Sequence, residues 1–457
     1  MSGIAEVLLN LGFRVSGSDL AIGEVCERLE RLGANISEGH ARSNLQEDVS
    51  LLVYSSAVSQ ENPELLEARR RGIPVVRRAE VLAELVRLKF GIAVAGSHGK
   101  TTTTSMIGWI LEQAELDPTV IVGGRVHQRA SGATIGKGEF LVAESDESDR
   151  SFLLLRSTIA VVTNIDHEHL TAYSSFDDLK DSFRQFVEAV PFYGLAVFGI
   201  DNSEVSELAR HYSRRKSTFG FSADADLRIE RVEYSASGSS FVVCSSDHGE
   251  RAFHVPFPGR HFILNAVAAI AVARELQIAE RIIGSAIESF PGVQRRLEVC
   301  GEAKGMRVIS DYAHHPTEIR ATLEAIDLSR SGPESRILAI FQPHRYSRVR
   351  DCFEGFCSAF EKSDVVFVMD VYSAGETPIE GMSGRELSHA LRHQDARYGG
   401  DLHSMIEQVL SEARPGDQIV CLGAGSIGAL AHELASKIAL QLPKVSSANS
   451  GESRASH

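Results

Sequence analysis

The run GSHGKTTTT at residues 96–104 places glycines, a lysine and threonines in an order that suits phosphate binding. It follows the apolar segment FGIAVAG at 90–96 and opens a helical pattern. The first N–H groups of a helix can bind a phosphate, and glycine lets the backbone approach it closely. Lys100 would reach the β- and γ-phosphate oxygens, and the Thr101 hydroxyl would lie where Mg²⁺ binds. Val94 replaces the first glycine of the usual Walker motif, so the run predicts a shortened nucleotide loop; a glycine turn with a solvated lysine is the alternative.

Two acidic clusters end predicted strands in the same region. ESDESD (144–149) follows EFLVA, and NIDHEHL (164–170) follows IAVVT. Ligands of α/β proteins bind at the carboxyl ends of strands, and carboxylate oxygens suit Mg²⁺ better than zinc. A solvated loop is the alternative for either cluster alone, and His167 and His169 taken alone would more often be structural. Because both clusters end strands beside the lysine loop, we expect a Mg²⁺ site there.

Basic groups are concentrated in the last third of the chain. DYAHHPTE (311–318) follows the strand pattern RVIS, and QPHRYSRVRD (342–351) follows RILAIF. Arginine binds carboxylates and phosphates in bidentate geometry, so these arginines predict an anion site; a basic helix face is the alternative. GAGSIG (423–428) matches GxGxxG, but no following strand could carry an acidic ribose partner. A tight strand–helix turn is the favoured interpretation.

The segments that position these groups alternate between strand and helix patterns. One series runs from residue 2 to Gly72, and a second begins near residue 90 and includes antiparallel strands over 226–255 and a buried helix over 263–277. A third series begins near residue 298. This alternation predicts an α/β fold with parallel sheets. The predicted domains are listed by range: 1–88, 89–297 and 298–443, with a disordered tail over 444–457.

Composition excludes several classes of protein. A net charge of −14 argues against a nucleic-acid partner, and 43% hydrophobic residues with 38 glycines fit a globular protein. The six cysteines form no CxxC pair and no metal-ligand spacing. There is no secretory signal and no apolar run near 18 residues. We therefore expect a reduced, cytoplasmic protein without a membrane segment.

Nine stretches together resemble the Mur ligase family, and they occur in the family's order. They are MSGIAEVLLNLGFRVSGSDL, GSHGKTTTT, ESDESD, NIDHEHL, PGRHFILNA, GVQRRLE, DYAHHPTE, QPHRYSRVRD and VYSAGETPIEG. The resemblance implies three domains: a Rossmann-like UDP-sugar-binding domain, a central P-loop ATPase-type domain, and a C-terminal Rossmann-like domain that binds the amino acid.

The resemblance also implies a reaction in peptidoglycan precursor synthesis. ATP would phosphorylate the lactyl carboxylate of UDP-N-acetylmuramic acid, and the amine of L-alanine would attack the acyl phosphate. The products would be an amide, ADP and phosphate. Such a reaction needs positive charge around the phosphoryl group and a clamp for the amino acid. The implied cofactors are ATP and Mg²⁺, the implied partners are the two small-molecule substrates, and we expect a monomer or weak dimer.

Individual residues take roles from the same resemblance. The nucleotide set is Gly96, Ser97, His98, Gly99, Lys100, Thr101, Thr102, Asn265, Arg296 and Asp311. The metal set is Thr101, Glu144 and His169. The L-alanine set is Tyr312, His314, His344, Arg345 and Arg348, and the UDP-sugar set is Ser18, Asp19, Ser55 and Ser56. The catalytic roles would belong to Lys100, Glu144, His169, His314 and Arg345.

Two departures from the family pattern carry expectations. Phe262 replaces an asparagine of many relatives, which would remove a polar contact near the base or ribose. The family pattern also has a strand and a glycine loop, GIGGxGM, before SGIAE, and this sequence starts at the last residue of that motif. We therefore expect an incomplete first domain, with its first strand missing, and weak affinity for the UDP substrate. Arg184 lies near the offset of a carbamoylated lysine found in several relatives, so no such lysine is assigned.

Three other functions stay open at this point. A related ligase joins a recycled tripeptide to the same UDP-sugar, although ESDESD and QPHRYSRVR favour the alanine enzyme. A catalytically dead nucleotide-binding paralogue would keep the loop but not the chemistry, and the presence of Lys100, Glu144 and His169 argues against it. A generic P-loop kinase would need an acceptor-base motif, and none is found.

Overall fold

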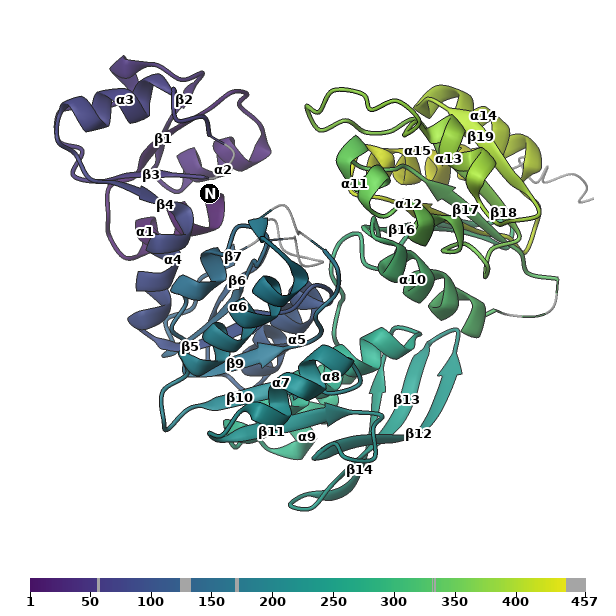
Figure 1. The fold of residues 1–457 in the computed structure, drawn as a ribbon, viewed down its shortest axis with the longest axis horizontal. Coiled ribbons are helices and arrows are strands. Elements are labelled where there is room, and N and C mark those ends of the chain that lie inside the picture. Colours follow the sequence, from purple (N-terminus) through teal and green to yellow (C-terminus); the bar gives the residue numbers. More distant parts are fainter. Residues whose placement is uncertain (56–57, 124–132, 169–171, 331, 333, 441–457) are drawn as a thin grey trace, which may run out of the picture. The chain divides into compact units, whose positions relative to one another are not determined.

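The computed structural model describes residues 1–55, 58–123, 133–168, 172–330, 332 and 334–440. The chain divides into two compact units, residues 1–294 and 295–457 (Figure 1). In both units helices alternate with strands, as the sequence patterns predict. Among the described residues, none of the helices has the length and apolar character needed to cross a membrane.

The first part of the N-terminal unit contains short elements. They are α1 (Ser2–Asn10), β1 (Ser16–Asp19), α2 (Glu24–Arg31), β2 (Asn35–Glu38), η1 (Arg42–Asn44), β3 (Leu52–Tyr54), α3 (Pro63–Arg70), β4 (Val75–Arg77) and α4 (Arg78–Arg87). The strands form two separate parallel pairs, β1–β2 and β3–β4. Helix α3 begins at Pro63 because the Asn62 side chain accepts the N–H of Glu64 and proline suits the first helical position.

A ten-stranded sheet follows in the same unit. Its strands are β5 (Phe90–Ala95), β6 (Thr119–Ile121), β7 (Ala133–Thr134), β8 (Phe140–Glu144), β9 (Ile159–Val162), β10 (Leu195–Gly199), β11 (Lys216–Gly220), β12 (Leu227–Ser235), β13 (Gly238–Ser245) and β14 (Gly249–Val255). Its helices are α5 (Lys100–Gln113), η2 (Ser151–Leu154), α6 (Phe176–Glu188), α7 (Ser203–His211), α8 (Arg260–Glu275) and α9 (Glu280–Glu288). The strand order is β14-β13-β12-β11-β10-β9-β5-β8-β6-β7, and β5 pairs in parallel with both β8 and β9. The lysine loop after β5 is therefore flanked by the loops that carry ESDESD and NIDHEHL.

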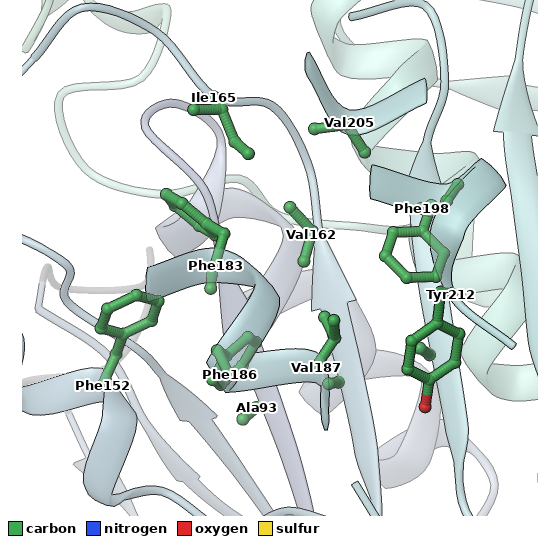
Figure 2. Packing of buried hydrophobic residues seen from close by; sticks show 14 of the residues in the cluster. Ala93, Phe152, Val162, Ile165, Phe183, Phe186, Val187, Phe198, Val205 and Tyr212 are labelled. Carbon is green, nitrogen blue, oxygen red and sulfur yellow. The ribbon is translucent and has the colours of Figure 1, made fainter. Parts of the chain in front are cut away.

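A hydrophobic cluster anchors the strands from which these loops emerge (Figure 2). The rings of Phe183 and Phe186 lie 5.2 and 5.3 Å from that of Phe152, and all three side chains are buried. Ala93 of β5 and Ile165, just after β9, belong to the same cluster. Each fully buried phenylalanine contributes about 1.5–3 kcal/mol. This packing fixes the positions at which β5 and β9 end.

The C-terminal unit is built on a second, six-stranded sheet. Its strands are β15 (Glu298–Ala303), β16 (Met306–Asp311), β17 (Ile337–Phe341), β18 (Val365–Met369), β19 (Ala396–Gly400) and β20 (Gln418–Leu422). Its helices are α10 (Pro316–Leu328), α11 (Tyr346–Asp351), α12 (Phe353–Cys357), α13 (Gly384–Ala390), α14 (Leu402–Glu412) and α15 (Ile427–Leu440). The order is β15-β16-β20-β17-β18-β19, with β15 antiparallel to β16. Because β16 and β17 both neighbour β20, the basic segments that follow them leave the sheet at the same edge.

Candidate functional site

Two glycines make the conformation of the lysine loop possible. Gly96 has a φ of +135°, and a Cβ there would lie 2.1 Å from Thr163 Oγ1. Gly99 precedes α5 with a φ of +83°, and a Cβ there would lie 2.5 Å from Asn265 Oδ1. A side chain at either position would therefore collide with its neighbours in a backbone conformation that favours glycine. The loop leads into the N-terminus of α5, where the helix dipole favours an anion.

Lys100 begins α5, and four oxygen atoms surround its ammonium group. Nζ donates to the carbonyl of Gly96 at 2.6 Å and to that of Ser97 at 3.2 Å. It lies 3.0 and 2.8 Å from the two carboxylate oxygens of Glu147. Only 11% of the Lys100 side chain and 1% of the Glu147 side chain are exposed. A buried ion pair thus lies where the sequence predicts a phosphate contact.

Thr101 and Glu144, two of the three predicted metal ligands, are in direct contact. Thr101 Oγ1 lies 2.9 and 3.0 Å from the carboxylate oxygens of Glu144. The same carboxylate accepts the N–H of Gly123 at 2.7 Å. Hydroxyl and carboxylate oxygens are ligands that Mg²⁺ prefers, so this donor pair fits that ion. The third predicted ligand, His169, lies outside the described residues.

The acidic residues of ESDESD face different surroundings. Glu144 and Glu147 contact the lysine loop, as described above. Asp146 accepts the N–H of Ser148 at 3.0 Å, and exposed Asp149 accepts the N–H of Ser151 at 2.9 Å. The sequence predicted a role for Glu144 but not for Glu147, because spacing alone did not show which acidic side chains turn inward.

The charges of this cluster shift one another's pKa values. Burial lowers the pKa of the Lys100 ammonium, but the carboxylates of Glu147, Glu144 and Asp146 outweigh burial and raise that pKa. Burial raises the pKa of Glu147 to about 7, against the opposing charge of Lys100. Lys100 therefore stays cationic at neutral pH, while Glu147 can take up a proton at a pH close to neutral.

The segment after β9 holds the middle of the lysine loop. The N–H of His98 donates to Asn164 Oδ1 at 2.8 Å, and Asn164 Nδ2 returns a bond to the His98 carbonyl at 3.0 Å. His98 Nε2 lies 3.0 Å from Asp166 Oδ2, and the N–H of Asp166 donates to Ser97 Oγ at 2.8 Å. Sequence reasoning assigned no role to Asn164 or Asp166. Their position directly after a strand that neighbours β5 was the available signal.

Asn265 of α8 lies beside the lysine loop, and Phe262 does not share that environment. Asn265 is buried, and its Oδ1 accepts the Thr103 hydroxyl at 3.2 Å. Phe262 is also buried, and its ring stacks on that of Phe257 with centroids 4.7 Å apart. The residue that departs from the family pattern is therefore part of the hydrophobic packing of α8.

In the C-terminal unit, His344 and Arg348 adjoin each other. Arg348 Nη1 lies 3.3 Å from His344 Nδ1, and because arginine only donates, Nδ1 accepts and the ring is neutral. The His344 ring stacks on Tyr372 with centroids 5.5 Å apart. Burial, followed by the charges of Arg348, His314 and Arg345, lowers the pKa of His344 to about 4. A neutral imidazole thus lies among cationic neighbours.

Arg345 is exposed and has an unusual backbone conformation. Its φ is +67°, in the left-handed region that favours glycine, and its N–H donates to the Tyr372 carbonyl at 2.8 Å. Such strain persists only where surrounding structure imposes it, and it is concentrated at functional sites. The exposed guanidinium can take a carboxylate in bidentate geometry.

The loop after β16 brings three of the predicted residues together. The guanidinium of Arg296 lies 5.4 Å from the centre of the Tyr312 ring, and the His314 ring lies 5.3 Å from it. The rings of His314 and His344 are 6.3 Å apart, so the segments after β16 and β17 meet. Asp311 is buried instead, and its two oxygens accept the N–H groups of residues 297 and 313 at 2.8 and 2.9 Å. Its carboxylate shapes the backbone of this loop.

Ser18, one of the four residues predicted for the UDP-sugar, has polar neighbours. Its hydroxyl donates to Glu64 Oε2 at 2.9 Å and lies 2.8 Å from His40 Nδ1. Asp19 ends β1, and its carbonyl accepts the N–H of residue 39 at 2.7 Å. Ser55 is half-buried after β3, and Ser56 lies outside the described residues. The structure thus leaves Ser18 and Asp19 together at one strand end.

The glycine run 423–426 forms the tight turn between β20 and α15 that the sequence predicted. Gln342 Oε1 accepts the N–H of Ile427 at 3.0 Å, and the guanidinium of Arg295 donates to the carbonyl of Gly423. Side chains of the protein therefore already form hydrogen bonds with backbone groups of this turn.

Glu298, Cys300 and His432 offer metal-type ligand atoms within 4.8 Å of one another in the same unit. Burial raises the pKa of Cys300 to about 12, which disfavours the thiolate that metals bind.

Family models match this chain in three consecutive segments. They describe a "Mur ligase family, catalytic domain" over residues 1–90, a "Mur ligase middle domain" over 94–273, and a "Mur ligase, glutamate ligase domain" over 295–425. Together they span most of the sequence, in the order that the motifs predicted.

Curated relatives and a solved structure resemble the chain over nearly its whole length. The UDP-N-acetylmuramate–L-alanine ligase of Geotalea uraniireducens (strain Rf4) is 48% identical over 443 residues, which cover 96% of this chain and 95% of the relative. The enzyme of that name from Geobacter sp. (strain M21) is 49% identical over 433 residues, 93% of each chain. The crystal structure of UDP-N-acetylmuramate–alanine ligase from Thermotoga maritima has a TM-score of 0.80 and 26% identity, and the match covers 96% of both chains. The fold is therefore the three-domain Mur ligase architecture.

Proposed function

The chain belongs to the Mur ligase family, and we propose that it is an ATP-dependent ligase that joins L-alanine to the lactyl carboxylate of UDP-N-acetylmuramate. The reaction proceeds through an acyl phosphate and releases ADP and phosphate. The observation that carries this proposal is the lysine loop held between the two acidic loops, in a chain 48% identical to a curated ligase over 96% of its length. The product is a precursor of peptidoglycan.

The N-terminal unit would bind the nucleotide. Lys100 is placed to neutralise the γ-phosphate, and N–H groups at the start of α5 are placed to bind its oxygens. Thr101 and Glu144 would hold Mg²⁺, which when bound would offset the charge of the transferring phosphoryl group. Gly96, Gly99 and the segment after β9 keep this loop in shape.

The C-terminal unit would bind the amino acid. Exposed Arg345 and half-buried Arg348 are suited to the carboxylate of L-alanine, and neutral His344 is suited to orient it by hydrogen bonding. Tyr312 and His314 adjoin this group through the ring contact between the two histidines. Such a clamp would hold the amine for attack on the acyl phosphate.

The proposal extends to the remaining partners. Ser18 and Asp19 at the end of β1, with Ser55, are the described candidates for the UDP-sugar. ATP and Mg²⁺ are the proposed cofactors. The proposed location is the cytoplasm, and the proposed state is a monomer or weak dimer.

Phosphate release from ATP tests the proposed function. The protein is incubated with ATP, Mg²⁺ and UDP-N-acetylmuramate, and with L-alanine, L-serine, glycine or the recycling tripeptide in turn. Release that requires L-alanine is expected. Release that requires the tripeptide instead would replace the proposal with the recycling ligase, and silence with every acceptor while ATP binds would indicate a nucleotide-binding paralogue without activity.

A further inference from the structure

The first two side chains of α5 each contact a carboxylate, one from the last residue of β8 and one from the loop that follows it. Lys100 is paired with Glu147, and Thr101 is paired with Glu144. These carboxylates occupy the Lys100 ammonium and the Thr101 hydroxyl, which a nucleotide phosphate and its metal would otherwise contact. Glu144 has a role in the proposed function as a metal ligand, but Glu147 has none.

Lys100 has no N–H to spare for a phosphate. Its three N–H groups face four acceptors, namely the carbonyls of Gly96 and Ser97 and both oxygens of Glu147. A phosphate oxygen can therefore bind the ammonium only if one of these acceptors gives way. Both carbonyls belong to the loop that presents Lys100, so they stay close to its ammonium wherever the loop remains folded. Glu147 belongs to a separate segment, the loop after β8, and its negative charge repels that of a phosphate.

Glu147 is held firmly in this position. The Tyr173 hydroxyl donates to the Glu147 carbonyl at 2.5 Å, and the guanidinium of Arg150 lies 4.6 Å from the centre of the Tyr173 ring. The Glu147 side chain is 1% exposed, so it has little freedom to turn into solvent. The backbone of Glu147 is therefore anchored, and its buried carboxylate is enclosed beside the lysine loop.

We propose that Glu147 is the resting counter-ion of Lys100 and makes tight nucleotide binding depend on a divalent cation. A metal-free nucleotide must compete with Glu147 for Lys100 and brings its own negative charge next to that buried carboxylate, which is costly. A divalent cation on the phosphates offsets the charge that Glu147 repels. This inference rests on the proposed use of Lys100 for ATP.

Calorimetric titration of the full chain with ATP, in EDTA and then in Mg²⁺, tests the proposal on the Glu147→Gln variant. We expect ATP to bind about tenfold more tightly than to the wild type in EDTA, with a clearly smaller gain in Mg²⁺. The matched control is Asp149→Asn, which removes the same charge from the same segment but from an exposed side chain. It should leave the affinity in EDTA nearly unchanged.

Two other results would overturn the proposal. Equal gains in the Glu147→Gln and Asp149→Asn variants would show a general charge effect. Unchanged or weaker binding to Glu147→Gln in EDTA would show that Glu147 merely supports the loop. If Glu147→Gln does not fold, Glu147→Asp keeps a carboxylate but loosens the pair, and its affinity for ATP in EDTA should lie between that of the wild type and the roughly tenfold higher affinity expected for Glu147→Gln. Phosphate release by the wild type tests the proposed function separately, because that assay varies the acceptor L-alanine and changes nothing at position 147.

Discussion

The two groups of charged residues, around Lys100 and around His344, differ in how their cations are neutralised. In the N-terminal unit, Lys100 is buried against Glu147, so the cation is already neutralised by the protein. In the C-terminal unit, burial and then the charges of neighbouring cations lower the pKa of His344 to about 4. The nearby carboxylate of Glu376 accepts the N–H and hydroxyl of Ser347 at 3.0 and 2.6 Å. A ligand of the first group would compete with the Glu147 carboxylate for Lys100, whereas in the second group the exposed guanidinium of Arg345 can bind a carboxylate directly.

The largest effect on activity should come from removing the cation of the group around Lys100. Lys100→Ala is expected to lower kcat for phosphate release by about a thousandfold or more, because charge on the transferring phosphoryl group would lose its partner. Phosphate release at saturating substrates measures this loss. Lys180→Ala, on α6, is the control for loss of a lysine away from the loop, and it should stay within about twofold of the wild type. Activity of Lys100→Ala within tenfold of the wild type would remove Lys100 from the chemistry.

The second prediction tests the group around His344. Arg345→Ala should raise KM for L-alanine by about a hundredfold and leave KM for ATP nearly unchanged, because a bidentate charge-assisted contact would be lost. Steady-state kinetics with each substrate varied in turn measure the split. Arg350→Ala is the matched control, since exposed Arg350, on the helix that follows Arg345, pairs with Asp351 at 2.8 Å. If alanine dependence is the same in both variants, the C-terminal unit does not bind the amino acid through Arg345.

Local sequence signals predicted much of this comparison. The lysine loop lies in consecutive residues, and the apolar runs FGIAVAG, EFLVA and IAVVT predicted β5, β8 and β9. The short, partly exposed strands β2, β11 and β19 carry too few apolar residues to be recognised, and they were missed. Glu147 was missed for another reason. Its inward direction depends on how the loop after β8 packs against β5, and no local pattern encodes that packing.

The third prediction concerns the glycine that lets the lysine loop pack closely. Gly99→Ala should destabilise the N-terminal unit by about 3 kcal/mol and weaken ATP binding, because φ is +83° and a Cβ would lie 2.5 Å from Asn265 Oδ1. Gly249→Ala separates strain from collision, since Gly249 has a φ of +62° but nothing within 4 Å of a Cβ. That variant should lose only about 1 kcal/mol. Calorimetric unfolding and ATP titration measure both, and equal losses would mean that the contact with Asn265 is easily relieved.

The smallest effect should appear in how the stability of the C-terminal unit depends on pH. The pKa of His344 is about 4 in the folded chain and near 6.5 when unfolded, so its neutral form supports the fold above pH 6.5. Acidification from pH 7 toward 4 should remove about 1–2 kcal/mol of that stability, a value reduced for partial exposure of the ring.

His344→Asn keeps an acceptor for Arg348 but cannot gain the charge. Its unfolding temperature should therefore fall less than that of the wild type over the same pH range. His403→Asn, at a side chain that is 80% exposed, should follow the wild type. Parallel curves for all three proteins would mean that neither burial nor the neighbouring cations disfavour the charged form of His344 in the folded chain.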